Sequence, residues 1–567
     1  MPPTSSISNV PPRSTSFSSA DDNEKKDHTE AAVLLTLAGT DAAGKTTAPE
    51  ETIKKNEAAL GGLQRRLNPR QIGMISIAGT IGTGLFLGTG SSLITGGPGS
   101  LLINYSIIGA LMFVLVNCVT EMVTQLPVAG AWPTYVHRFI DEPAAFAYGW
   151  LSVAGLSVAI AGDLVVTQLL IQWWTDKLVW LIALFFIAGL AATNLFTVKA
   201  YGELEYWLAL LKVIAIVIFF IVGIVVNAGG NTDRTYIGAK NWTIGEAPFV
   251  NGFAGFASLF VNAAFAYGGT ESVGIAAAEA KNPTRQLKRI ASRILGRILV
   301  FYVLTVLLIN FNVPYTYPDL STASTATSPF TIVLSQAGAR AGGSFMNVVI
   351  LTSVLSACNM GLFGGSRILY GMSLRGHAPA VFSELTKRGV PWASTLLIIT
   401  ISLVFFGISF APGGAGKIWT YCQAVVGVNN QFGWVFIGLS SWRMRSAWVK
   451  QGKPLPALKA PNPMGSWGAP IVVVSFVFII LVQGWSSFSP SFNAEKFVQS
   501  YLEIPVLFVL YWSFRLTTRS RTPSLLEVDL VTGTHEESKE DEEDNGRIER
   551  RERGKFGWGW KAYSWIA

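Results

Sequence analysis

Residues 79–90 read GTIGTGLFLGTG, within a stretch that is otherwise apolar enough to form a membrane helix. Each of the five glycines in these twelve residues disfavours a helix by about 1 kcal/mol relative to alanine, so a continuous helix is not expected. If the helix breaks, its freed backbone N–H groups and the positive end of its dipole can bind an anion. Alternatively, Gly84 and Gly88 allow another helix to pack closely. A nucleotide-binding loop is excluded, because it requires a preceding strand in a soluble unit.

A second apolar stretch with adjacent glycines, residues 265–272, reads FAYGGTES and adds the carboxylate of Glu271. An ionisable group at membrane depth is energetically expensive, so Glu271 is a candidate functional residue. This stretch lies in the sixth expected membrane span, which is the first span of a second set of five spans. A pair of glycine-interrupted helices in corresponding positions is typical of a transporter built from inverted repeats.

The charged residues are concentrated at the two ends of the 567-residue chain. Between residues 71 and 516, 40 of 446 residues are Asp, Glu, Lys or Arg, against 38 of the other 121. This segregation excludes a secreted enzyme, a nucleic-acid-binding protein and a single-pass receptor. It predicts a disordered N-terminal tail (1–68), a membrane domain (69–516) and a C-terminal tail (517–567).

Apolar runs long enough to cross a hydrocarbon core of ~30 Å recur from residue 71 onward. A further segment, 328–337, is amphipathic, as expected of a helix lying along the membrane surface. The pattern predicts an all-α membrane protein with twelve spans, near 72–94, 100–126, 145–173, 178–198, 206–227, 252–278, 294–312, 343–366, 393–411, 418–440, 470–485 and 499–516.

The loops after even-numbered spans carry most of the loop lysines and arginines, so the positive-inside rule places these loops and both tails in the cytoplasm. The loop 228–251 is then external, and its Asn241-Trp242-Thr243 is a candidate glycosylation sequon. Such tripeptides also occur often by chance. The C-terminal tail is acidic over residues 536–544 and then basic. We interpret it as a solvated tail or, alternatively, as a docking segment for trafficking factors or ubiquitin-ligase adaptors.

Three further polar residues lie within expected spans: Asp163, Lys212 and Asn359. Each could simply hydrogen-bond neighbouring helices, an alternative that is weaker for the two charged residues because a lone charge in the bilayer costs several kcal/mol. Glu121 and Glu503 lie nearer the ends of their spans, where we expect their side chains to reach the interface.

Several segments, in the right order across most of the membrane domain, resemble the fungal amino acid permeases of the amino acid–polyamine–organocation superfamily. The most specific is YGGTESVGIAAAEAKNP at 267–283. The others are the Gly79–Gly84 stretch with LITGGP at 93–98, Pro127–Gly130, Tyr135–Pro143, SRILYG at 366–371 and GHAP at 376–379.

The resemblance implies a LeuT-like fold of five plus five inverted repeats and two extra helices, with spans 1 and 6 broken. It implies that the substrate carboxylate binds the opened span 1 at Gly82, Thr83 and Gly84. It also implies that the substrate ammonium binds carbonyls that map to Thr80, Phe265 and Gly268, and that Phe265 is an aromatic gate. Lys212 corresponds to a lysine of proton-driven relatives, and Glu271 to the glutamate of the G-T-E segment.

Together these features predict a secondary transporter that imports an amino acid with a proton, most simply across the plasma membrane. The partners are then the substrate, a proton and the lipid bilayer, with no nucleic acid, metal or cofactor. The proton-coupling candidates are Glu271, Lys212 and Asp163. An amino acid sensor on a transporter scaffold is the alternative. A membrane enzyme is disfavoured because all four histidines lie outside the expected spans.

Overall fold

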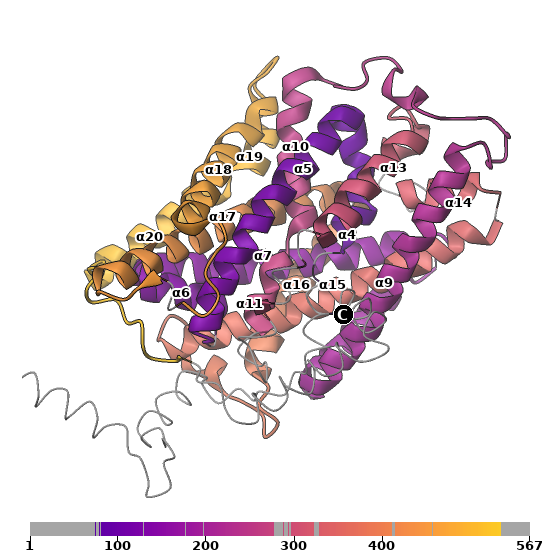
Figure 1. Cartoon of the computed structure of the whole chain (residues 1–567). Helices are drawn as coiled ribbons and strands as arrows, with labels where there is room; N and C mark the ends of the chain where they lie inside the picture. Colours follow the sequence, from indigo (N-terminus) through magenta and orange to yellow (C-terminus); the bar gives the residue numbers. More distant parts are fainter. Residues whose placement is uncertain are drawn as a thin grey trace, which may run out of the picture. The chain divides into compact units, whose positions relative to one another are not determined.

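The computed structural model consists of helices and the segments that join them (Figure 1), and the residues that it describes contain no strand. These residues are 74, 79, 81–128, 130–175, 177–196, 198–276, 287–288, 293, 296–321, 328–338, 340–410, 414–455 and 458–534. The α-helices of the first half are α4 (Thr83–Phe86), α5 (Gly88–Gln125), α6 (Ala131–Phe139), α7 (Glu142–Ile171), α8 (Val179–Phe196), α9 (Val198–Asn227), α10 (Gly252–Tyr267) and α11 (Val273–Ala276).

The second half continues the helical pattern. Its helices are the π-helical η4 (Leu299–Leu304), α13 (Thr305–Asn312), α14 (Pro329–Gln336), α15 (Arg340–Leu374), α16 (Trp392–Gly407), α17 (Gly414–Lys450), α18 (Gly468–Val482), α19 (Ala494–Tyr501) and α20 (Glu503–Thr518). Helix α7 packs against α15, α16, α17 and α20, and α10 packs against α5 and α17. The core around α7 and α10 is therefore built from helices that are distant in sequence.

Six of the described helices are long and apolar enough to cross a membrane, and a seventh span is obtained if the bent pair α19–α20 is counted as one. Helices 179–195 and 296–312 are apolar but shorter. The chain is thus a multi-pass membrane protein, although fewer of its helices qualify individually than the twelve expected. One reason is that helices break within expected spans: α10, for example, has only 16 residues, fewer than the ~20 that a continuous span requires.

A sharp turn inside α5 separates two stretches of helix. Gly97 has φ +77°, a conformation that favours glycine, and Pro98 follows it. The turn is held to a distant segment, because Gly99 N–H donates to the carbonyl of Pro248 (2.9 Å) and Val250 N–H donates to that of Gly96 (3.0 Å). This turn separates the first expected span from the second.

The 328–337 segment packs inside the bundle, so the expectation of a surface helix is wrong. All residues of 329–334 are buried. The Phe330 ring lies 4.8 Å from that of Phe86 and 4.3 Å from that of Phe219. Ser328 Oγ also donates to the carbonyl of Phe86 (2.8 Å). Burial of its apolar residues against α4 and α9 thus outweighs any preference for the membrane surface.

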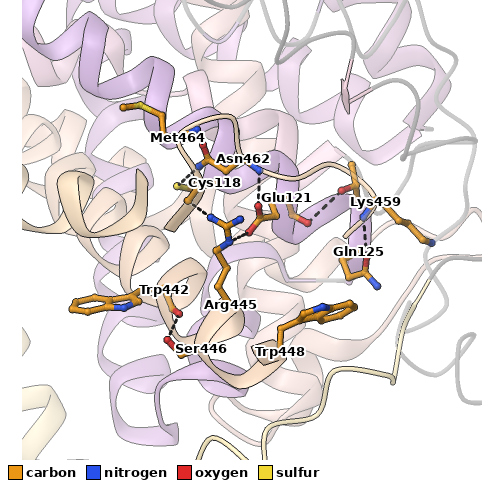
Figure 2. A network of polar contacts seen from close by, with 12 residues as sticks. Cys118, Glu121, Gln125, Trp442, Arg445, Ser446, Trp448, Lys459, Asn462 and Met464 are labelled. Atoms are coloured by element: carbon orange, nitrogen blue, oxygen red, sulfur yellow. Dashed lines mark hydrogen bonds and ion pairs between the residues drawn. The ribbon is translucent and has the colours of Figure 1, made fainter. Parts of the chain in front are cut away.

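Glu121 does not extend to the interface as the sequence suggested; it lies in a buried polar network (Figure 2). Its Oε1 is 3.1 Å from Nε of Arg445 on α17, and its Oε2 accepts a hydrogen bond from Asn462 N–H (2.6 Å). Arg445 also donates to the carbonyl of Gly465, and the Asn462 amide donates to the sulfur of Cys118 (3.2 Å). Glu503 is buried as well. The network joins α5, α17 and the segment that leads to α18.

The chain packs back onto the helices after α20 ends at Thr518. Arg443 donates to the carbonyl of Pro523 (2.7 Å), Gln451 to that of Val528 (2.8 Å) and Arg138 to that of Thr532 (2.7 Å). Val528 is buried. We call residues 523–532 the C-terminal strap.

Candidate functional site

The first glycine-rich stretch begins a helix in the middle of its expected span. Gly82 is extended (φ −130°, ψ −168°) and α4 begins at Thr83. The carbonyl of Gly82 accepts hydrogen bonds from Leu85 N–H (3.2 Å) and Phe86 N–H (3.4 Å). The N–H groups at the start of α4 cannot find partners within the helix, as at any helix N-terminus. Thr80 lies outside the described residues.

The second stretch ends a helix at a similar point. Helix α10 ends at Tyr267, Gly268 leaves the helical region (φ −56°, ψ 142°) and Gly269 has φ +89°. Only glycine adopts this last conformation without strain. A short 3₁₀ turn, Thr270–Ser272, leads into α11. The adjacent glycines therefore interrupt the helix where the sequence predicted.

The two interrupted segments touch through their backbones. A Cβ on Gly269 would lie 2.6 Å from the carbonyl oxygen of Gly79, and one on Gly84 would lie 2.4 Å from Cα of Ala266. A Cβ on Gly82, in contrast, would have no heavy atom within 4 Å. Gly84 is thus a packing glycine at the wall of the site, whereas Gly82 faces open space.

Between the two segments lies a cavity of about 140 Å³. Its wall is mostly small and apolar, contributed by α4, α7, α10, α15 and α17 together with the chain around both breaks. Its lining residues are Gly79, Gly82, Thr83, Gly84, Leu156, Ala159, Asp163, Phe265, Ala266, Gly268, Gly269, Glu271, Ser272, Ile275, Ala357, Met360, Gly361, Gly364, Val426 and Asn430. The cavity thus brings together most of the residues predicted to bind substrate.

Two carboxyl groups reach the cavity wall, one beside each break. Asp163 on α7 accepts a hydrogen bond from the Thr83 hydroxyl (3.1 Å). Glu271 accepts one from the indole N–H of Trp434 (3.1 Å) and a longer one from Gly269 N–H (3.4 Å). Each carboxyl group therefore accepts a hydrogen bond from one of the two interrupted segments: Asp163 from Thr83 and Glu271 from Gly269.

Phe265 lies on the cavity wall in the last turn of α10. It packs against an apolar cluster of Val158 on α7 with Cys422 and Val426 on α17. An aromatic ring in this position can cover a molecule in the cavity, as the gate interpretation requires.

Lys212 and Asn359 lie behind the wall. Lys212 is buried, and its Nζ donates to the carbonyl of Ile81 (2.8 Å) and to the hydroxyl of Ser356 (3.0 Å). The Asn359 amide donates to Glu205 (2.6 Å) and accepts a hydrogen bond from the Asn194 amide (2.6 Å). Asn359 therefore connects helices, as its structural interpretation anticipated.

Glu205 was missed by the sequence analysis, which began the fifth span at residue 206. The structure places it on α9 with no exposed surface. It stands seven residues before Lys212, a spacing that puts two residues on one face of a helix. That spacing was the available signal.

Asn241 is buried in a 3₁₀ turn (Lys240–Trp242), and its amide nitrogen donates to the carbonyl of Phe311 (2.9 Å). A glycan would be attached through this nitrogen. The folded structure therefore disfavours glycosylation of the sequon.

Two histidines meet away from the cavity. The rings of His137 and His377 are 5.6 Å apart, edge to face. Burial, with a smaller contribution from nearby Arg375, lowers the pKa of both imidazoles to about 4. Both are therefore uncharged at neutral pH and are poor candidates for a proton-dependent step there.

Comparison with known families identifies the chain's relatives. Residues 71–527 match the model of the family described as amino acid permease. The chain belongs to this family. Its members are transporters rather than enzymes, and this permease has an amino acid as its substrate.

Individual relatives align along most of their length. The permease is 36% identical over 502 residues to a cationic amino acid transporter of Schizosaccharomyces pombe, covering 86% of this chain and 85% of the relative. It is 36% identical to a general amino-acid permease of Candida albicans (84% and 82% covered). It is also 33% identical to the lysine-specific permease of Escherichia coli (80% and 94% covered).

Proposed function

We propose that this permease imports an amino acid together with a proton by alternating access. The observation that supports the proposal most directly is the cavity between two interrupted segments, whose backbone forms part of its wall. A carboxyl group lies beside each segment: Asp163 of α7 beside the first and Glu271 in the second. Interrupted helices at the membrane midplane are the arrangement by which many secondary transporters hold a zwitterionic substrate.

The same proposal assigns the helices to twelve spans with a five-plus-five inverted repeat and two extra helices. Span 1 comprises α4 and the part of α5 before Gly97, and span 2 is the remainder of α5. Spans 3 to 6 are α7, α8, α9 and α10 with α11. Spans 7 to 12 are η4 with α13, α15, α16, α17, α18 and α20. Spans 1 and 6 are the broken pair.

In this proposal the substrate carboxylate binds the N–H groups at Gly82, Thr83 and Gly84. The open space beside Gly82 supports this position. The ammonium binds carbonyls of Thr80, Phe265 and Gly268, and the Phe265 ring closes over the bound molecule. Transport then requires the site to open to each side in turn.

Three ionisable residues are candidates for the coupled proton: Asp163, Lys212 and Glu271. Lys212 is favoured because its ammonium group contacts the carbonyl of Ile81, immediately before the break in span 1. A change in its protonation can therefore alter the geometry of the substrate site directly. Asp163 and Glu271 each bind a hydrogen-bond donor beside a break and are well placed to stabilise the folded site.

For the cellular setting, we propose the plasma membrane with both termini in the cytoplasm, as the distribution of Lys and Arg in the loops indicates. The tails then face cytoplasmic trafficking factors or ubiquitin-ligase adaptors.

Transport by purified permease in liposomes tests the function. With an acidic exterior, we expect labelled amino acid to accumulate inside against its own gradient, and a protonophore to abolish the accumulation. Equal uptake with and without the pH gradient would remove proton coupling. Saturable binding without any flux would favour the sensor alternative.

Competition by unlabelled amino acids should reveal a preference set by charge. The cavity wall carries two carboxyl groups and, among the lining residues that the structure describes, no lysine or arginine. We therefore expect neutral or cationic amino acids to inhibit labelled uptake at least tenfold more strongly than aspartate or glutamate. The relatives named for cationic amino acids and lysine support this direction. Strong inhibition by glutamate would contradict it.

Replacing Glu271 by glutamine separates a structural carboxyl from a proton carrier. Glutamine keeps one oxygen to accept the Trp434 N–H but cannot titrate. We expect Glu271→Gln to transport more slowly with nearly unchanged stimulation by external acid, measured as initial uptake between about pH 4.5 and 7.5. Loss of acid stimulation, with substrate exchange retained, would instead assign the proton to Glu271.

A further inference from the structure

A buried polar cluster lies behind the wall of the cavity, between α8, α9 and α15. We call Asn194, Glu205, Lys212, Ser356 and Asn359 the Glu205 cluster. One carboxylate oxygen of Glu205 accepts a hydrogen bond from Ser356 Oγ (2.6 Å) and the other accepts one from the Asn359 amide (2.6 Å). All five residues are buried. A carboxyl group at this depth is costly unless its charge is compensated.

Lys212 provides that compensation through one intervening hydroxyl. Ser356 Oγ accepts a hydrogen bond from Lys212 Nζ (3.0 Å) and donates a hydrogen bond to the Glu205 carboxylate. Lys212 also donates to the carbonyl of Ile81, which accepts a second hydrogen bond from Ser353 (3.2 Å). The chain of contacts therefore runs from Glu205 to the residue that precedes Gly82 in the substrate site.

The other groups around Lys212 are mostly neutral. Asp163 on α7 interacts with it electrostatically, but the hydrogen bond of that carboxyl goes to Thr83. The described contacts from α8 and α15 come from amide and hydroxyl groups. Among the hydrogen bonds described for these helices, Glu205 is thus the acidic group that shares a hydrogen-bonded path with Lys212.

We propose that Glu205 is a positioning residue for proton coupling. Through Ser356, Glu205 favours the protonated form of Lys212 and so controls the hydrogen bond from Lys212 to the carbonyl of Ile81. A proton from outside adds to the lone pair of the Lys212 amine, and the same proton leaves this nitrogen when the site faces inward. The inference rests on the proposed function, since it assigns a residue to the control of that coupled proton.

The test measures net uptake against external pH in liposomes, for wild type and Glu205→Gln. Glutamine removes the charge but keeps the size, so the protonated Lys212 loses its counter-ion. We expect the pH of half-maximal uptake to move about one to two units toward acid, while substrate exchange measured at low pH remains. Glu205→Asp, which restores the carboxylate, should move the profile back toward wild type.

Glu503→Gln is the matched control, because it makes the same chemical change at another buried carboxyl, on α20 and outside the cluster. We expect its pH profile to match wild type. In a Lys212→Met background, which should lose pH dependence, Glu205→Gln should have no further effect on the profile. If Glu205→Gln does not fold, Ser356→Ala interrupts the same path and should shift the profile in the same direction.

Two results are distinguishable failures. If wild type responds to external acid but Glu205→Gln (or Ser356→Ala, where that variant carries the test) only scales uptake down with the same midpoint, the positioning role is overturned and the proposed function stands. If wild-type uptake does not depend on the proton gradient, proton coupling itself fails and this inference falls with it.

Discussion

Arg445→Met is expected to destabilise the folded permease by about 3–5 kcal/mol, because it leaves the Glu121 carboxylate buried without its ion-pair partner. Glu121 has 1% of its surface exposed, so water cannot replace the lost arginine. The lost stability should appear as a lower midpoint temperature of unfolding in detergent. This midpoint is measured by size-exclusion chromatography of samples heated to a series of temperatures.

Two controls isolate the unpaired charge. Replacing both partners, as Glu121→Gln with Arg445→Met, removes the buried charge and should recover most of the loss. Lys417→Met removes a cation whose ion pair with Glu495 (3.5 Å) is exposed, and it should not change the midpoint measurably. An Arg445→Met variant as stable as Lys417→Met would show that the buried pair contributes little.

Gly84→Ala is expected to abolish uptake by damaging the fold, whereas Gly82→Ala should fold and bind substrate poorly. The methyl group on Gly84 would meet the backbone of Ala266 at 2.4 Å, and a backbone atom cannot rotate away as a flexible side chain can. Overpacking of this kind typically costs 1–3 kcal/mol, and more where the neighbour is rigid. The methyl group on Gly82 meets no atom but occupies space proposed for the substrate carboxylate.

The two glycine variants are compared by the amount of monodisperse protein and by KM. We expect little folded Gly84→Ala, and normal amounts of Gly82→Ala with a KM raised about tenfold or more. A Gly82→Ala variant with unchanged KM would place the carboxylate elsewhere. Normal folding of Gly84→Ala would mean that α4 and α10 can separate without loss.

These expectations differ from what the sequence alone supported, and the reason is physical. Glycine clusters indicate where helices begin and end, because the cost of glycine in a helix is local. In the described residues, α4 begins and α10 ends within the two glycine clusters. Whether a glycine leaves room for a side chain depends, at Gly84, on the position of Ala266, more than 180 residues away along the chain. The local sequence therefore allowed two roles for Gly84, anion binding or close helix packing, and could not decide between them.

The buried charges show the same limit. Glu271, Asp163 and Lys212 were recognisable because they interrupt apolar runs. Glu205 lies at the expected start of a span, where a charged residue is ordinary. Its importance depends on Ser356 and Asn359, which the fold brings from another helix.

The number of membrane spans illustrates a difference between hydropathy and helix geometry. Apolar runs in the sequence predict twelve membrane crossings. Among the described helices, six are individually long and apolar enough to cross a membrane, or seven if the bent pair α19–α20 is counted as one. A hydropathy window continues across the Gly268–Gly269 break, whereas the helix itself ends at Tyr267. Interruption at the candidate site thus shortens the helices that form its wall.

The C-terminal strap has a practical consequence for engineering. Its carbonyl groups accept hydrogen bonds from Arg138, Arg443 and Gln451, so the strap completes the surface formed by α6 and α17. A truncation or reporter fusion made just after α20, where the apolar sequence ends, would leave these donors exposed and uncover the apolar site that buries Val528 and Leu530. Fluorescent or affinity tags are therefore better attached beyond Thr534 than at the end of the last helix.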